Sequence, residues 1–202
     1  MRNTWTRFTK AALLGGGIFL AACSGPQLQL EPIPVTANPT EEATKLETEL
    51  ATARQQQVNV LAPTWYGKAE GSLAEAKAIV GQKGEMGAIG TNVSRGRAEL
   101  GKAQEMAKIS RTAIPEAIKG RDLARVAGAT VFGQDYADVE SQFLDLTREI
   151  EDDNLSYAQR NEKKVVDAFR VIEIRAIKET TLGEVRTLLA QAEKEGAKKL
   201  AP

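Results

Sequence analysis

The sequence predicts an all-α protein, an elongated antiparallel helical bundle with long helices and coiled-coil-like packing, preceded by a signal peptide and a proline-rich tether. Small and apolar residues recur every three or four positions through most of residues 40–202, which is the spacing of one face of an α-helix. No segment alternates apolar and polar residues for long enough to form a pair of strands. Prolines and glycines separate the periodic segments, so each segment is expected to be a helix of its own.

Two helices are expected at the start of the bundle. The first covers about 40–60, because Asn38 can cap it and a proline suits its first position. Gln57 interrupts its apolar stripe, and Pro63 starts a second helix that continues to about residue 80. The expected buried positions of these helices are Ala43, Leu46, Leu50, Ala53, Trp65, Tyr66, Ala69, Leu73, Ala76 and Val80.

A glycine-rich turn precedes the third helix, which is expected over about 90–113. Two glycines inside it, Gly96 and Gly101, are expected to let a neighbouring helix approach closely. Pro115 must break this run because it lacks an N–H group, and a fourth helix follows over about 115–128. The expected buried positions are Val93, Leu100, Ala103, Ala107, Ile109 or Ser110, Ile118, Ala124 and Ala127.

Two further helices complete the predicted bundle. Asp135 can cap the first, which continues to Ile150 and an acidic turn. The last covers about 155–196 and reaches roughly 60 Å at ~1.5 Å per residue. Its expected buried stripe consists of Val165 or Val166, Phe169, Ile172, Ala176, Val185, Leu188 and Ala192. The ion pairs expected on the exposed face of the bundle are Glu70 with Lys77 and Glu99 with Lys102.

The first 22 residues have the order of a secretory signal. Arg2, Arg7 and Lys10 precede an apolar run over 11–22, and small residues stand directly before Cys23. As a helix this run is only about 18 Å long, too short to cross a ~30 Å hydrocarbon core. The sequence therefore predicts a leader over residues 1–22 that is removed.

The stretch Leu20-Ala21-Ala22-Cys23 resembles the lipobox of bacterial lipoproteins. The resemblance implies cleavage before Cys23, a diacylglyceryl group on its thiol and an acyl chain such as palmitate on its new amine. Ser24, which stands where an aspartate would retain such a protein at the inner membrane, implies by the same resemblance the outer membrane of a Gram-negative cell. The alternative is an ordinary signal peptide in which Cys23 is incidental.

Residues 23–39 are expected to form the lipidated cysteine and a flexible tether. They show no apolar period and carry four prolines, Pro26, Pro32, Pro34 and Pro39. Fully extended at ~3.1 Å per residue, this segment would span roughly 50 Å. The helical domain is then expected to occupy residues 40–202.

Composition excludes several classes of chemistry. The chain has no histidine and one cysteine, so zinc sites of Cys and His, Cys–His nucleophiles, Ser–His–Asp triads and disulfides are excluded by count. It carries 27 basic and 27 acidic residues, a balance that gives no electrostatic footprint for nucleic acid. No cofactor or metal site is expected. The acidic cluster Glu149, Glu151, Asp152 and Asp153 lacks the central glycine of a calcium loop and is interpreted as a solvated turn.

Three stretches within roughly residues 45–202 are informative together: Leu61–Tyr66 with Leu73–Lys77, Gly128–Gly133 with Asp135 and Tyr136, and Lys178–Lys194. They resemble a domain of unknown function, DUF4398, found in bacterial envelope lipoproteins. In that family the helical segment often precedes a peptidoglycan-binding domain similar to the C-terminal domain of the outer-membrane protein OmpA, whose βαβ pattern is not visible here. The tripeptide Leu200-Ala201-Pro202 repeats Leu61-Ala62-Pro63, which leads to the expectation that the chain is a shortened version of a longer protein.

These observations predict a non-enzymatic outer-membrane lipoprotein that acts as a structural or interaction module of the cell envelope and faces the periplasm. Its expected partners are the membrane, through Cys23, and an envelope protein or peptidoglycan. One alternative is a periplasmic module that binds a glycan or small ligand between its helices, with contacts at Trp65 and Tyr66. Another is an enzyme that uses carboxylates alone. The oligomeric state stays open, because stripes of small residues pack equally within one chain or between two.

Overall fold

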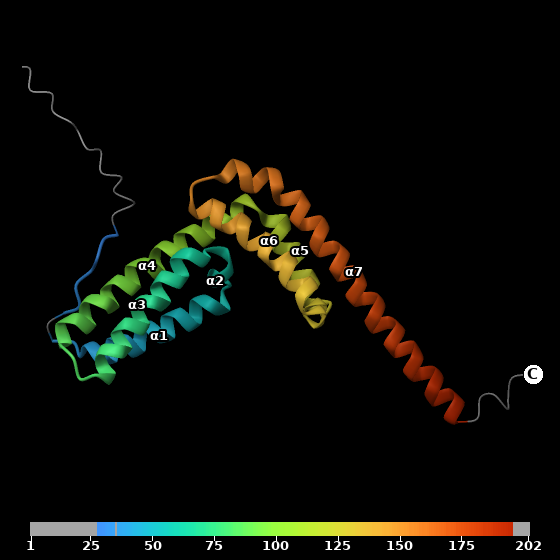
Figure 1. The fold of residues 1–202 in the computed structure, drawn as a ribbon, viewed down its shortest axis with the longest axis horizontal. Coiled ribbons are helices and arrows are strands. Elements are labelled where there is room, and N and C mark those ends of the chain that lie inside the picture. Colours follow the sequence, from blue (N-terminus) through green and yellow to red (C-terminus); the bar gives the residue numbers. More distant parts are fainter. Residues whose placement is uncertain (1–27, 35, 196–202) are drawn as a thin grey trace, which may run out of the picture.

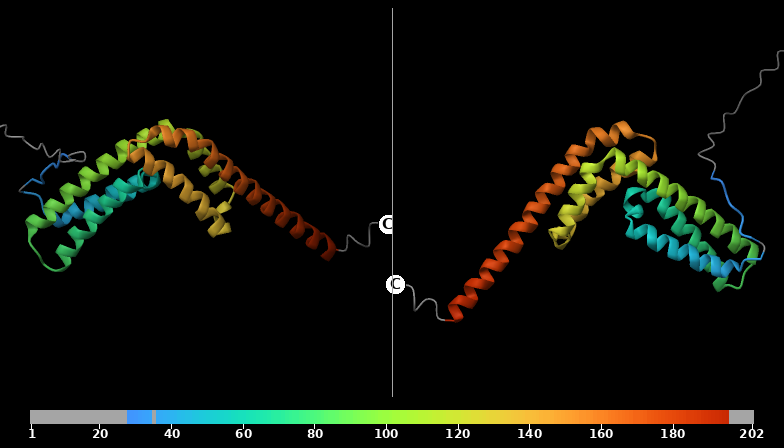
Figure 2. Two further views of the ribbon diagram at one scale, coloured as in Figure 1. Left: turned by 45° about the horizontal axis from the view of Figure 1, so that its top comes forward. Right: turned by 180° about the vertical axis from the view of Figure 1, so that it is seen from behind.

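The computed structural model of the chain describes residues 28–34 and 36–195, and these residues form an all-α structure, as predicted. The helices are α1 (Pro39–Gln55), α2 (Val58–Leu61), α3 (Pro63–Gly81), α4 (Met86–Ala113), α5 (Pro115–Val126), the 3₁₀ helix η1 (Ala129–Phe132), α6 (Gln134–Glu151) and α7 (Leu155–Lys194). They form two arms that meet at an angle, with α1–α4 in one arm and α5–α7 in the other (Figure 1, Figure 2). The predicted leader and Cys23 lie outside the described residues.

The first arm packs around the long pair α3 and α4, with α1 alongside both. Every expected buried position of α1 and most of those of α3 lie in the core, including Leu46 and Ala69, which are fully buried. Gly96 allows the close approach predicted for it, because a Cβ there would lie 2.7 Å from Cδ2 of Leu46. The same prediction was wrong for Gly101, where a Cβ would meet nothing within 4 Å.

The second arm is a three-helix unit in which α7 packs against both α5 and α6. Its core contains Phe143 of α6 and Phe169 of α7, whose rings meet edge to face with centroids 6.1 Å apart. Gly120 brings α5 close to α7, because a Cβ there would lie 3.6 Å from that of Phe169. The two arms are joined where Ile114, fully buried, leaves helical geometry before Pro115.

Three local expectations about helix boundaries need correction. The segment expected as one helix over 40–60 is two, because Gln57 adopts a left-handed conformation with φ of 61° between α1 and α2. The helix expected from residue 90 begins at Met86. Asp135 does not cap α6, since Gly133 occupies the cap position, and its carboxylate instead pairs with Arg175 of α7.

The expected burial of two further sets of residues also needs correction. Glu99 was placed on an exposed face, yet it is only 7% exposed and accepts a hydrogen bond of 2.6 Å from the hydroxyl of Ser72. In α7 the predicted stripe is buried as far as Ala176, but Val185 and Leu188 are 46% and 65% exposed. The ion pairs also differ from those expected, because Lys77 pairs with Glu47 and Lys102 with Glu105.

Candidate functional site

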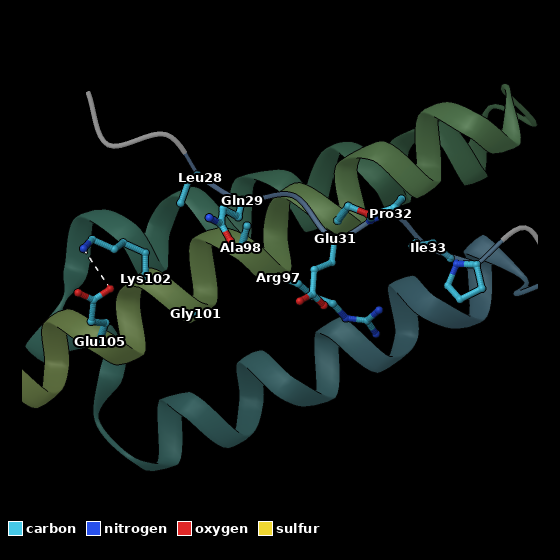
Figure 3. Close-up of a pocket in the computed structure, with 12 residues that line it drawn as sticks. Leu28, Gln29, Glu31, Pro32, Ile33, Arg97, Ala98, Gly101, Lys102 and Glu105 are labelled. Carbon is cyan, nitrogen blue, oxygen red and sulfur yellow. Dashed lines mark hydrogen bonds and ion pairs between the residues drawn. The ribbon is translucent and has the colours of Figure 1, made fainter. Parts of the chain in front are cut away.

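A groove of about 750 Å³ lies between the segment at 28–34 and the outer face of α4 (Figure 3). The segment passes over α4 in extended form, as expected of a chain with Pro32 and Pro34. Ile33 packs against the core, and a Cβ at Gly90 of α4 would lie 3.9 Å from its Cδ1. This part of the predicted tether therefore lies on the bundle.

The turn from this segment into α1 follows from the local sequence. The backbone N–H of Ala37 donates to the carbonyl of Pro34 at 2.9 Å, which closes a turn. Asn38 then caps α1 as predicted, with its side-chain oxygen accepting from the N–H of Thr40 at 3.0 Å. Pro39 occupies the first helical position, where its missing N–H group costs nothing.

Three charged side chains that line the groove, Arg97, Lys102 and Glu105, form ion pairs with one another or with α1. Arg97 reaches the carboxylates of Glu42 at 2.7 Å and Glu49 at 3.2 Å. Partial burial lowers the pKa of Arg97, but the hydrogen bonds with these two carboxylates outweigh it and raise the pKa overall. Lys102 pairs with Glu105 one turn further along α4 (Figure 3). The two pairs of Arg97 thus connect α4 to α1, and apolar residues of the groove include Leu28, Pro32 and Ile33.

The predicted ligand contacts, Trp65 and Tyr66, lie at the start of α3 and point to different environments. Tyr66 is 2% exposed, and its hydroxyl donates to the carbonyl of Leu50 at 3.0 Å. Its ring closes the core between α1 and α3, with the guanidinium of Arg54 5.7 Å from the ring centroid. Trp65 is half-buried, and the ammonium of Lys68 lies 3.9 Å over its ring. Ligand contacts at Trp65 and Tyr66 both stay predictions; Tyr66, although nearly buried, is one of the residues that line a shallow hollow between α1 and α3.

Two carboxylates from distant helices cap the starts of α3 and α5, a role that the sequence did not predict for them. Glu151 accepts from the backbone N–H groups of Thr64 and Trp65, both at 2.9 Å. Glu162 accepts from those of Glu116 and Ala117 at 2.9 and 3.1 Å. The sequence does indicate that these two helix starts need a cap from elsewhere in the chain. Ala62 and Ile114 precede the helix-starting prolines, and neither has a side chain that can cap a helix.

A buried polar cluster lies where the two arms meet. Arg121 is 6% exposed, and its guanidinium binds the carboxylate of Glu140 with a closest distance of 2.6 Å and the side-chain oxygen of Gln57 at 3.0 Å. The hydroxyl of Tyr136 donates to Glu140 at 3.1 Å. Burial, followed by the nearby charge of Glu140, raises the pKa of Tyr136 to about 12, so the hydroxyl stays protonated and donating.

Within residues 28–34 and 36–195, no group of three or more acidic, histidine or cysteine side chains is arranged to hold a metal ion. No described helix combines the length and the apolar character needed to cross a membrane. Comparisons of the chain with protein-family models, with curated proteins and with solved structures find no match.

Proposed function

We propose that the chain is a non-enzymatic, lipid-anchored module of the bacterial envelope that acts by holding or contacting other envelope components. The observation that carries the proposal is the order of the first 23 residues, a basic start, a short apolar run and the lipobox-like stretch that ends at Cys23. Lipid chains on Cys23 would hold the protein in the outer membrane, because each buried CH₂ contributes about 0.8 kcal/mol. The helical domain would then face the periplasm.

The shape of the domain supports an interaction role. Several of its charged groups form pairs that connect two helices, such as Arg54 with Glu70 and Arg97 with Glu42. The 40 residues of α7 span about 60 Å at ~1.5 Å per residue, a reach suited to bridging two layers of an envelope. The resemblance to envelope lipoprotein domains points the same way and stays a prediction.

The proposal is tested by the intact mass and membrane fractionation of the expressed protein, compared with a Cys23→Ser variant. We expect a mass corresponding to the chain from Cys23 with three acyl chains, fractionating with the outer membrane. The Cys23→Ser variant should lose both the added mass and the membrane association. Ser24→Ala is the matched control, since it alters the neighbouring residue and keeps the thiol. An unmodified, soluble native protein would overturn the proposal.

The alternative, a module that binds a glycan or small ligand, has one specific observation in its favour. A shallow hollow of about 350 Å³ lies between α1 and α3, beside Arg54, Tyr66 and Glu70. Its test uses Trp65, because the other tryptophan, Trp5, lies in the predicted leader. Soluble peptidoglycan fragments that shift the tryptophan emission of the native protein, and shift it further in a Lys68→Ala variant whose Trp65 ring is uncovered, would favour this alternative. Unchanged emission at saturating fragment would favour the structural module.

A further inference from the structure

Helix α7 carries two apolar faces. The inner face packs on α5 and α6 and consists of Ala158, Val165, Phe169, Ile172 and Ala176. The outer face consists of Val171, Ile174, Ile177, Leu182, Val185, Leu188 and Leu189. At 3.6 residues per turn the centres of these two faces are about 180° apart around the helix. The outer face is therefore a second apolar stripe, separate from the one that holds α7 in its own arm.

This outer stripe is exposed along its whole length. Its seven side chains are between 41% and 71% exposed. The inner face ends at Ala176, and beyond that point α7 extends past α5 and α6 without a described neighbour (Figure 1, Figure 2). A continuous apolar stripe of this length on the surface of a folded domain marks an interaction site.

We propose that a second copy of this chain covers the outer stripe, with the two α7 helices parallel and in register. The positions of charged residues beside the stripe support a second copy as the partner and a parallel orientation of the two helices. Glu173 and Glu184 flank the stripe on one side. Arg186 and Arg175, the latter also paired with Asp135 of its own chain, flank it on the other, with Glu179 farther from the stripe on that side. In a parallel two-fold pair the acidic flank of one helix faces the basic flank of its partner. An antiparallel pair would set acidic against acidic and basic against basic, which is unfavourable.

The one charge inside the stripe, Lys178, fits the same arrangement. It lies between Ile174 and Leu182, in a shallow hollow on the outer face of α7. Its aliphatic stem can pack along the stripe, while its ammonium reaches outward to solvent or to the acidic flank of the partner. A single lysine in an apolar seam lowers the stability of a pair and fixes its register.

The area available is enough for a weak dimer. Residues 171–189 span about 28 Å at ~1.5 Å per residue, and pairing two such stripes buries on the order of 1,000 Å² in total. This is the lower end of specific interfaces, so association is expected to depend on protein concentration. Anchoring in one membrane would raise the effective concentration, and a parallel pair keeps both N-terminal segments on the same side. The pairing itself rests on α7 and holds whether or not Cys23 is lipidated.

The first test is disulfide cross-linking of the full chain in cell envelopes and in detergent. Ile174→Cys and Val185→Cys, introduced singly, should each form a disulfide with their own copy under mild oxidation. Ala190→Cys, on the opposite side of the same helix, is the matched control and should not. The native chain, with Cys23 alone, sets the background. In a parallel, in-register pair every stripe residue faces its own copy, so both variants should cross-link. In an antiparallel pair only a residue at the two-fold axis faces its own copy, so cross-linking at only one of the two positions would overturn the parallel arrangement.

The second test is sedimentation velocity of the purified full chain over a range of concentrations. The double variant Val185→Glu with Leu188→Glu should raise the dimer dissociation constant by at least about tenfold, because it places charges in the seam. Thr187→Glu with Ala190→Glu is the control on the opposite side, and circular dichroism checks that both variants keep their helix content. A native chain that stays monomeric and forms no disulfide at either position would overturn the inference. Disulfides from the stripe to a different protein would overturn it as well.

These outcomes are distinguishable from a failure of the proposed function. The mass and fractionation of Cys23→Ser report on the anchor alone. Cross-linking and sedimentation report on α7 alone. A soluble, unmodified dimer would therefore retain this inference while rejecting the lipid anchor.

Discussion

Glu151, the last residue of α6, accepts a hydrogen bond of 2.9 Å from the backbone N–H of Trp65, which stands 86 positions earlier in the chain. The same carboxylate accepts from the N–H of Thr64. Because the exposed N–H groups at a helix start carry a partial positive charge, a carboxylate there is favourable in both hydrogen bonding and charge. Glu151 thus fixes the start of α3 against the end of α6, and it links the two arms.

Removing this cap should weaken the fold by a measurable amount. We expect Glu151→Ala to lower the free energy of unfolding by about 1–2 kcal/mol, since two N–H donors lose their charged acceptor. Urea denaturation followed by circular dichroism measures the change. Asp152→Ala is the matched control, because Asp152 is the exposed neighbour and makes no such contact to α3 in the described structure. Equal stability of the two variants would contradict the capping role.

Two glycines of α4 should respond in opposite directions to the same substitution. Gly96→Ala places a Cβ 2.7 Å from Leu46 and 3.3 Å from Ser72, both buried, so we expect a loss of about 1–3 kcal/mol. Gly101→Ala meets nothing within 4 Å and should gain roughly 0.5–1 kcal/mol, because alanine is the better helix former. Thermal unfolding of the pair checks both signs at once. A stabilised Gly96→Ala variant would contradict the close contact of α1 with α4.

The buried ion pair between Arg121 and Glu140 should be costly to break from one side. Arg121→Ala leaves the carboxylate of Glu140, whose side chain is 18% exposed, without its partner, and we expect a loss of about 3 kcal/mol or more. Arg125→Ala on the exposed face of α5 is the matched control and should change stability by less than about 0.5 kcal/mol. Replacing both partners, as in Arg121→Met with Glu140→Leu, should recover most of the loss, because no uncompensated charge remains. Chemical denaturation of the single and double variants measures these differences.

The parts of the fold that sequence predicts well are those governed by local rules. Pro63 and Pro115 begin helices because the first helical position needs no N–H, and that rule holds whatever the surroundings are. Asn38 caps α1 for a similarly local reason. Periodicity likewise identified the inner stripe of α7 as far as Ala176. Each of these depends on residues within one or two turns.

The features that were missed depend on distant residues. Gln57 holds a left-handed conformation while its amide binds Asp122 at 3.1 Å and its oxygen accepts from Arg121, partners more than sixty positions away. Glu99 is buried because Ser72 of another helix donates to it. Exposure of Val185 was missed for a third reason, because periodicity identifies an apolar face and does not say which element covers it. The candidate groove also required the fold, since nothing local places Ile33 against α4.

The raised pKa of Tyr136 leads to a prediction about alkaline stability. Its pKa is about 12 in the folded chain against about 10 in the unfolded chain, so between these values the folded state holds one more proton. The contribution is fully present below pH 10 and is lost as the pH rises towards 12. Allowing for its partial exposure, we expect a loss of about 1–2 kcal/mol over that window.

The measurement compares the native chain with Tyr136→Phe by urea denaturation between pH 9 and pH 11.5. Lysine deprotonation lowers the stability of both proteins, so the informative quantity is the difference between them. Above pH 10 the native chain should lose more free energy of unfolding than the variant, since the variant has no hydroxyl to ionise. Tyr157→Phe, at an exposed tyrosine of α7, is the matched control and should follow the native chain. A Tyr136→Phe curve parallel to the native one throughout would show that this hydroxyl ionises equally in the folded and unfolded states, and that its hydrogen bond to Glu140 does not hold its proton.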